Sequence, residues 1–283
     1  MRPHSGSIFL ASSFSTPKQL IRLYMSKCCL CGYSGNLVNA HVIPEAFFRE
    51  MRTDNNVPIL ISNTPNTFRK RSPIGVYDQD ILCDKCELKF SAVDDYGVQV
   101  LLKQLHNLFL PVIQDNHIVA YQAENINQDL LLRFFIATLW RASVSTQPFY
   151  NRVKLGSLEL IAKQTILNPD KPIPKQFSAV LSRWIVDEES LYVTKGLMDP
   201  FPEKPIGVNV YRFYFGEVVA HIKADSRPFP KSLRRFALLE QPNVMLITRE
   251  ASNSKDWAAM INTVKEAYKN YDEMQKTHQK KNV

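Results

Sequence analysis

The chain has 283 residues, with 35 Lys and Arg against 27 Asp and Glu, so its formal net charge at pH 7 is +8. Hydrophobic residues make up 45% and charged residues 22%, which excludes an intrinsically disordered protein. No apolar run reaches the roughly 18 residues that a membrane span requires, so we expect no membrane partner. The positive charge is spread along the chain. This charge is compatible with a polyanionic partner. It is equally compatible with a basic surface that only keeps the protein soluble.

We expect residues 1–24 to form a poorly ordered leader, with Met25 as an alternative start of translation. Residues 25–105 contain short elements and many turn formers. Two apolar pairs within residues 37–43 predict a short hairpin or a bent strand. Residues 52–80 are interrupted by prolines and a glycine and therefore predict a long loop, which usually has a purpose or is mobile.

Four of the five cysteines form two Cys-x-x-Cys pairs, Cys28 with Cys31 and Cys83 with Cys86. An odd count arranged in such pairs favours a metal over a disulfide framework and predicts a reducing compartment, the cytoplasm. Each pair can form a tight knuckle, and four thiolates in a tetrahedron make a zinc site. Cys29 is left over, because a single residue separates it from Cys31. Four thiolates leave no open coordination position, so we expect a structural zinc.

Residues 106–283 predict an α+β domain of unknown role, with a soft boundary near residues 106–125. Apolar side chains at helical spacing indicate the helices, one of which is apolar on nearly all sides and should be buried. Segments rich in β-branched and aromatic residues indicate the strands. The predicted helices cover about residues 87–101, 128–145, 152–167 and 255–275, and the predicted strands 177–186, 208–215, 218–223 and 244–248.

The region around the cysteine pairs resembles the HNH endonucleases, on the residues Ala-His-Val-Ile-Pro at 40–44 and on the segment 81–90 around the second pair. The resemblance covers about residues 27–100 and implies a zinc-bearing ββα-metal fold. In that family the histidine of the strand is the general base that activates water against a DNA phosphodiester, while neighbouring side chains hold a divalent cation. The resemblance therefore implies hydrolysis of DNA with His41 as the base.

The chain departs from the family pattern at three positions. The acidic residue before the base is Ala40, the asparagine position falls at Asp78, and the last histidine is replaced by Glu87. The resemblance then implies that Asp78 and Glu87 hold Mg²⁺ or Mn²⁺, which prefer oxygen ligands. The alternative is that these carboxylates are solvated charges, that His41 is a structural histidine, and that the module has lost its metal.

Arg69, Lys70 and Arg71 lie in the long loop and could contact phosphates, although a charge run is often only a solvated surface. DNA is the expected partner, with RNA as the alternative, and the sequence leaves open whether the chain forms a homodimer. The predicted fold class is α+β, with a zinc-clamped ββα-metal (HNH-like) module followed by an α+β domain of antiparallel strands and a buried helix. The alternative functions are a non-catalytic zinc-stabilised module that binds nucleic acid or protein, and an active carboxy-terminal domain for which the zinc module is a scaffold.

Overall fold

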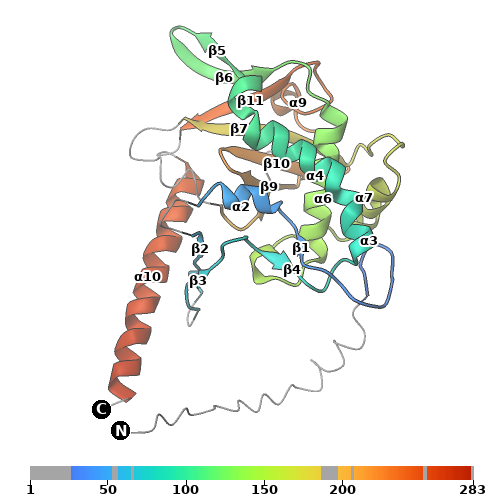
Figure 1. The fold of residues 1–283 in the computed structure, drawn as a ribbon. Coiled ribbons are helices and arrows are strands. Elements are labelled where there is room, and N and C mark those ends of the chain that lie inside the picture. The colour runs from blue at the N-terminus through green and yellow to red at the C-terminus, as the bar shows by residue number, and fades with distance from the viewer. Residues whose placement is uncertain are drawn as a thin grey trace, which may run out of the picture.

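The fold is known from a computed structural model, which describes residues 27–52, 57–64, 67–185, 197–204, 207–250 and 254–281. The expected leader at residues 1–24 lies outside these ranges. The fold is mixed α+β: α6 (Gln128–Val144) packs on one face of a large sheet, α9 (Lys231–Arg234) and the first turns of α10 (Lys255–Lys281) pack on the other, and short strand pairs lie beside it (Figure 1). Among the described residues, no helix combines the length and the apolar character needed to cross a membrane.

The regular elements follow the chain in this order. The helices are α2 (Glu45–Arg49), α3 (Asp84–Glu87), α4 (Ser91–Val98), α5 (Leu105–Leu108), α6 (Gln128–Val144), α7 (Leu158–Leu167), α9 (Lys231–Arg234) and α10 (Lys255–Lys281), with 3₁₀ turns at Leu88–Phe90 and Pro148–Tyr150 and a π-helical segment at Gln99–Lys103. The strands are β1 (Ala40–His41), β2 (Ile59–Leu60), β3 (Lys70–Arg71), β4 (Tyr77–Asp78), β5 (Leu110–Gln114), β6 (His117–Ala123), β7 (Phe177–Ile185), β8 (Phe201–Glu203), β9 (Val210–Phe215), β10 (Val218–Ala224) and β11 (Val244–Glu250).

The large sheet has seven strands in the order β5-β6-β11-β7-β10-β9-β8. The predicted antiparallel strands are confirmed, and β9 and β10 form the expected hairpin around Gly216, whose φ of 62° a glycine adopts without strain. The pair β11 and β7 is parallel, which the sequence did not predict. A parallel pair needs a long crossover, and here the chain between these strands forms β8, β9, β10 and α9.

Helix α6 is the buried central helix that its apolar sequence predicts. The Asn127 side chain caps it by accepting a hydrogen bond from the Leu130 backbone N–H at 3.0 Å. Every residue from 131 to 143 is buried. On the sheet side, Phe135 packs against Phe215, with ring centroids 5.5 Å apart. On the other side Gly97 of α4 allows close approach, because a Cβ atom there would lie 2.6 Å from the ring of Phe134.

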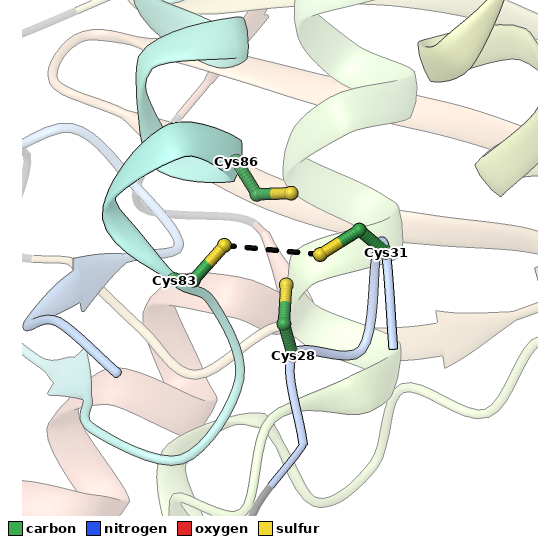
Figure 2. A group of neighbouring side chains, drawn as sticks. All are labelled: Cys28, Cys31, Cys83 and Cys86. Carbon is green, nitrogen blue, oxygen red and sulfur yellow. Dashed lines mark hydrogen bonds between the residues drawn. The ribbon is translucent and has the colours of Figure 1, made fainter. Parts of the chain in front are cut away.

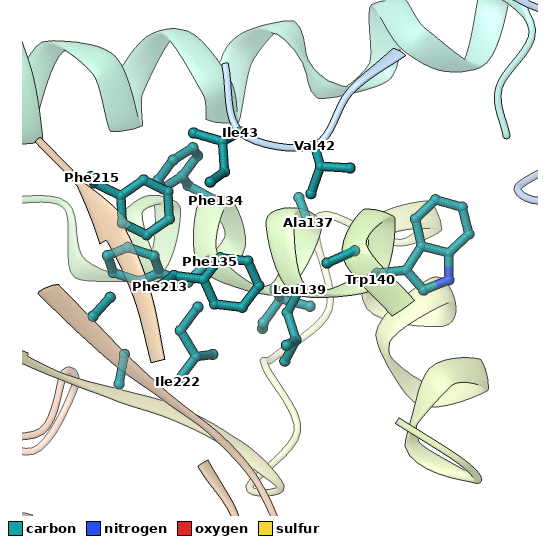
Figure 3. Packing of buried hydrophobic residues seen from close by; sticks show 14 of the residues in the cluster. Val42, Ile43, Phe134, Phe135, Ala137, Leu139, Trp140, Phe213, Phe215 and Ile222 are labelled. Atoms are coloured by element: carbon teal, nitrogen blue, oxygen red, sulfur yellow. The ribbon is translucent and has the colours of Figure 1, made fainter. Parts of the chain in front are cut away.

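One hydrophobic core joins the two predicted regions. Val42 and Ile43 of the first region belong to the same buried cluster as Phe134 and Phe213 of the second (Figure 3). Helices α4 and α6 also pack side by side. The boundary near residue 105 stays a prediction, but the first region shares its apolar interior with α6 and the sheet.

Several local predictions differ from the structure. The segment 37–43 forms no hairpin of its own, because its strand β1 pairs with β4. The long loop predicted for residues 52–80 contains the strand pair β2 and β3. The boundary expected near residues 106–125 is occupied by the hairpin of β5 and β6. Helix α7 begins at Leu158 rather than near residue 152, since Gly156 has a φ of 56° and the helix cannot extend through that conformation.

Only the first turns of helix α10 pack onto the large sheet. Asp256 forms ion pairs with Arg212 of β9 and with Arg249 of β11, and Met260 packs on the same face of the sheet. Beyond these turns the helix leaves the sheet and runs beside β2 and β3 (Figure 1).

Candidate functional site

The four paired cysteines come together in space. The Sγ atoms of Cys28, Cys31, Cys83 and Cys86 lie within 4.8 Å of one another, and those of Cys31 and Cys83 are 3.8 Å apart (Figure 2). A tetrahedral zinc with Zn–S bonds of about 2.3 Å would place its sulfurs about 3.8 Å apart. All are free thiols, so no disulfide competes for them. The cluster therefore has the ligand set and the spacing of a metal site.

Local backbone geometry turns each cysteine pair inward. In the first pair, Gly32 donates its N–H to the carbonyl of Cys28 at 2.8 Å, and its φ of 77° closes the turn. In the second pair, Cys83 is the N-cap of α3, and its carbonyl accepts from the N–H of Cys86 at 3.0 Å. Each pair is thus a tight turn that presents two sulfurs to the same point.

Backbone hydrogen bonds hold the two turns together independently of the thiols. The N–H of Cys29 donates to the carbonyl of Ile81 at 2.8 Å, and that of Val38 donates to Leu82 at 2.9 Å. The Cys29 carbonyl accepts from Lys163 of α7 at 2.7 Å. The side chain of Cys29 lies outside the cluster, as the spacing predicts. The four thiols are therefore brought together by the chain itself.

The thiols differ in acidity. Burial raises the pKa of Cys28, but backbone N–H groups of Cys31, Cys83 and Leu30 outweigh this effect and lower it to about 7. Burial and the neighbouring cysteines raise the pKa of Cys86. One thiolate thus forms readily near neutral pH, while Cys83 and Cys86, whose pKa values are raised by burial, need a cation to lose their protons.

His41 lies at the end of β1 and is held in one orientation. Its Nε2 atom is 3.0 Å from the carbonyl oxygen of Ile74, which can only accept, so Nε2 carries the proton and Nδ1 keeps a lone pair. The ring lies near Tyr77 of β4, with centroids 5.8 Å apart. Burial lowers the pKa of His41 below its ordinary value, although the Ile74 carbonyl and the Glu45 carboxylate favour the charged ring. His41 is a neutral, oriented histidine at pH 7.

The structure does not place Asp78 beside His41. Asp78 pairs with Ala40 in the ladder of β1 and β4, whereas His41 pairs with Tyr77. Because successive side chains of a strand point to opposite faces, Asp78 faces away from His41. It is fully buried, and its Oδ2 accepts from the hydroxyl of Ser145 at 2.8 Å and from the N–H of Thr146 at 2.6 Å. This correction makes Asp78 an anchor between β4 and the end of α6.

Glu87 lies nearer to His41, whose backbone N–H favours the charged form of the Glu87 carboxylate and so counteracts the rise of its pKa. Its Oε2 atom is buried and has no hydrogen-bond partner among the described residues. Burial raises the pKa of Glu87, while the positive charge of Arg141 counteracts that rise. Glu87 thus offers one free oxygen close to the histidine.

Arg141 provides a positive charge that sequence reasoning missed. This fully buried residue of α6 donates to both oxygens of Asp94, at 2.7 and 2.6 Å, and stacks over the ring of Phe90 at 4.7 Å. Asp94 thus pairs with a buried arginine rather than with solvent or a lysine. The signal was present in the sequence, because a charged residue inside a buried helix requires a partner.

The residues around His41 do not form the cation site that the resemblance implies. Within the described ranges, the four cysteines are the only group of three or more metal-binding side chains close enough to share an ion. Asp78 faces the other way, both oxygens of Asp94 bind Arg141, and only Glu87 has a free oxygen. Arg141 already places a positive charge beside Glu87, which opposes a second cation there.

The three basic residues of the long loop lie on β3 and just before it. Lys70 and Arg71 are exposed and form β3, and Arg69 stacks over the ring of Tyr271 in α10, with 4.8 Å from its Cζ to the ring centroid. The segment then continues to Ile74, whose carbonyl holds His41. The basic run and the histidine therefore belong to one short stretch of structure.

A separate hollow of about 740 Å³ lies in the second region, at the start of α7 and the adjoining ends of β8, β9 and β10. Its wall includes Lys154, Ser157, Lys204 and Arg227, and it contains none of the predicted site residues. The candidate site is at His41, because its ring is oriented by Ile74, its backbone N–H acts on Glu87, and Glu87 directly follows Cys86 of the cluster.

Comparison of the chain with protein-family models, with curated proteins and with solved structures finds no match.

Proposed function

We propose that this protein hydrolyses phosphodiester bonds of nucleic acid, with His41 as the general base. The observation that carries the proposal is the orientation of the ring, because the hydrogen bond from Nε2 to the Ile74 carbonyl leaves Nδ1 as the basic atom. A histidine that is neutral at pH 7 can accept a proton from water. The resemblance of residues 27–100 to the HNH endonucleases supports the same role, and DNA is the first substrate to test.

In the proposed reaction, Nδ1 of His41 accepts a proton from water as the water oxygen forms a bond to phosphorus. The bond from phosphorus to the leaving sugar oxygen breaks, and that oxygen takes a proton from solvent. The Ile74 carbonyl stabilises the imidazolium that results, because it accepts from the Nε2–H. We assign no step to a divalent cation, since the side chains around His41 do not fit one.

We further propose that the metal of the cysteine cluster is zinc and that its role is structural. Four thiolates fill the tetrahedron, so no position remains for water or substrate. The ion would fix the turn before β1 to the start of α3, and so hold His41 close to Glu87. Reduced thiols are required, so we place the protein in a reducing compartment such as the cytoplasm.

The test is to incubate the purified protein with supercoiled plasmid, with Mg²⁺ or Mn²⁺ added and with EDTA. His41→Ala should abolish nicking while zinc content stays at one ion per chain. His117→Ala is the matched control, because His117 is an exposed histidine on the β5–β6 hairpin and should leave nicking unchanged. Equal nicking by parent and His41→Ala, or none by either on DNA and RNA, would overturn the proposed role.

A second candidate function, a zinc-stabilised module that binds nucleic acid without catalysis, is favoured by one observation. Arg141 supplies the positive charge beside Glu87 and Asp94, and the described residues form no second group of three or more metal-binding side chains. Cleavage assays on DNA and RNA separate the two functions, because neither of them uses a divalent cation. Cleavage by the parent that His41→Ala abolishes would exclude this candidate. A zinc-loaded protein that cleaves neither DNA nor RNA would favour the binding module over the hydrolase.

A further inference from the structure

The last helix of the chain returns to the first region and lies beside the hairpin of β2 and β3 (Figure 1). Two contacts fix this arrangement. The guanidinium of Arg69 stacks on the ring of Tyr271, and the amide of Asn270 donates to the carbonyl of Asn63 at 3.3 Å. The hairpin and the middle of α10 therefore form one continuous surface from segments about 200 residues apart in the chain.

This surface combines positive charges with exposed aromatic rings. Residues 57–76, which include the hairpin, contain three basic side chains and no acidic one. Phe68 beside them is 54% exposed. On α10, Tyr268 lies one turn before Tyr271 and is 55% exposed. We define the basic–aromatic surface as Phe68, Arg69, Lys70, Arg71 and Tyr268, with Lys70 and Arg71 on opposite faces of the strand pair.

The net charge of this surface stays positive when its acidic neighbour is included. Asp272 lies one turn after Tyr268 and is exposed. Three cations, Arg69, Lys70 and Arg71, less this one carboxylate leave +2. An exposed phenyl ring and an exposed phenol ring among excess cations are poorly explained by solubility alone, because large aromatic side chains are normally buried.

The surface adjoins the His41 site through the chain that leaves β3. Arg71 is followed three residues later by Ile74, whose carbonyl holds the His41 ring. The preceding carbonyl, of Pro73, accepts from Nε of Arg52 at 2.7 Å. Three residues span at most about 10 Å, so a strand bound along β3 passes close to the histidine.

We propose that the basic–aromatic surface binds a single strand of nucleic acid and leads it to His41. The cations contact phosphates, and Phe68 and Tyr268 stack on unpaired bases, which a duplex would not expose to them. An acidic peptide would use the charges but not the rings. The inference rests on the proposed function, because the binding would supply substrate to the hydrolase. It names that substrate as single-stranded nucleic acid.

The test is fluorescence anisotropy with a labelled 20-nucleotide thymidine strand, the same strand as RNA, and a duplex. Zinc-bound parent protein and full-length His41→Ala are both used, so that cleavage does not alter the strand. Lys70→Glu with Arg71→Glu should weaken binding at least tenfold and reduce the salt dependence by about two phosphate contacts. Phe68→Ala and Tyr268→Ala should each weaken binding roughly tenfold for the single strand.

Lys231→Glu with Arg235→Glu is the matched control, since it makes the same charge change at exposed residues of and next to α9. It should leave the affinity within about twofold. The inference is overturned if the control weakens binding as much as the β3 variant, if the duplex binds as tightly as the single strand, or if the parent binds neither. Tight single-strand binding without any cleavage would instead refute the hydrolase and leave this surface assigned.

Discussion

Arg141 and Asp94 are joined by two hydrogen bonds, of 2.7 and 2.6 Å, between a guanidinium with no solvent exposure and a carboxylate that is 19% exposed. The pair ties the buried helix α6 to the helix that follows the cysteine cluster. A buried charge of this kind is compensated only while its partner is present. The join between the two regions therefore depends on a polar contact inside an apolar core.

Asp94→Asn should lower the free energy of unfolding by about 3–5 kcal/mol, because it removes the carboxylate that accepts both hydrogen bonds of the buried Arg141 guanidinium. Urea unfolding followed by tryptophan fluorescence measures this, since Trp140 is in the same helix. Asp95→Asn is the control, because Asp95 is the exposed neighbour of Asp94. It should change stability by no more than about 0.5 kcal/mol. Equal effects of the two substitutions would contradict the assigned role of the pair.

Cys86→Ser should abolish the zinc binding proposed for the cluster and most of the cooperativity of unfolding in the first region, because three thiolates no longer close the tetrahedron. Elemental analysis gives the zinc content, and thermal unfolding gives the stability. Cys29→Ser is the matched control from the same segment, since the Cys29 side chain lies outside the cluster. That variant should keep one zinc per chain. A Cys86→Ser protein that retains a full equivalent of zinc would show that the cluster is not the metal site.

The cysteine cluster and the main elements could be predicted because local signals specify them. The spacing of each cysteine pair alone favours a metal knuckle, and the apolar residues around α6 indicate a helix buried on all sides. The hairpin of β9 and β10 follows from its β-rich sequence and the glycine between the strands. In each case neighbouring residues carry the information.

Long-range pairing could not be predicted in the same way. Whether Asp78 faces His41 depends on the register of β1 with β4, and a shift of one residue would reverse it. The partner of Arg141 is 47 residues away in sequence, on another helix. The apolar stripe of α10 correctly predicts a helix. It does not indicate that the middle of this helix packs beside β2 and β3 and not on the large sheet.

Hydrolysis by the parent protein should rise with pH below 6.5 and level off near neutral pH. The pKa of His41 is lowered by burial, so the ring becomes the neutral base at a pH below the ordinary value for histidine. Initial rates of cleavage of a labelled oligonucleotide between pH 5 and 8 measure the profile. His117→Ala should show the same profile as the parent. A rate that first rises above pH 7.5 would show that a group other than neutral His41 limits the reaction.

His221 should make the folded protein less stable as the pH falls below 6.5. Burial and the charges of Arg249 and Arg212 lower its pKa to about 3, and they outweigh Glu203, whose Oε2 lies 3.4 Å from Nδ1. At a pH between the folded pKa of His221, about 3, and its unfolded pKa, about 6.5, the unfolded chain binds a proton that the folded protein does not. The stability of the folded protein is therefore full above the unfolded pKa and is lost as the pH falls toward the folded pKa. From pH 6.5 to 5.5 this loss amounts to about 1 kcal/mol. The glutamine of His221→Gln cannot titrate. Urea unfolding at the two pH values should therefore show a loss of unfolding free energy that is smaller by that amount. His117→Gln changes an exposed histidine and should lose as much unfolding free energy as the parent. Equal losses in all three proteins would show that His221 is not held neutral by its surroundings.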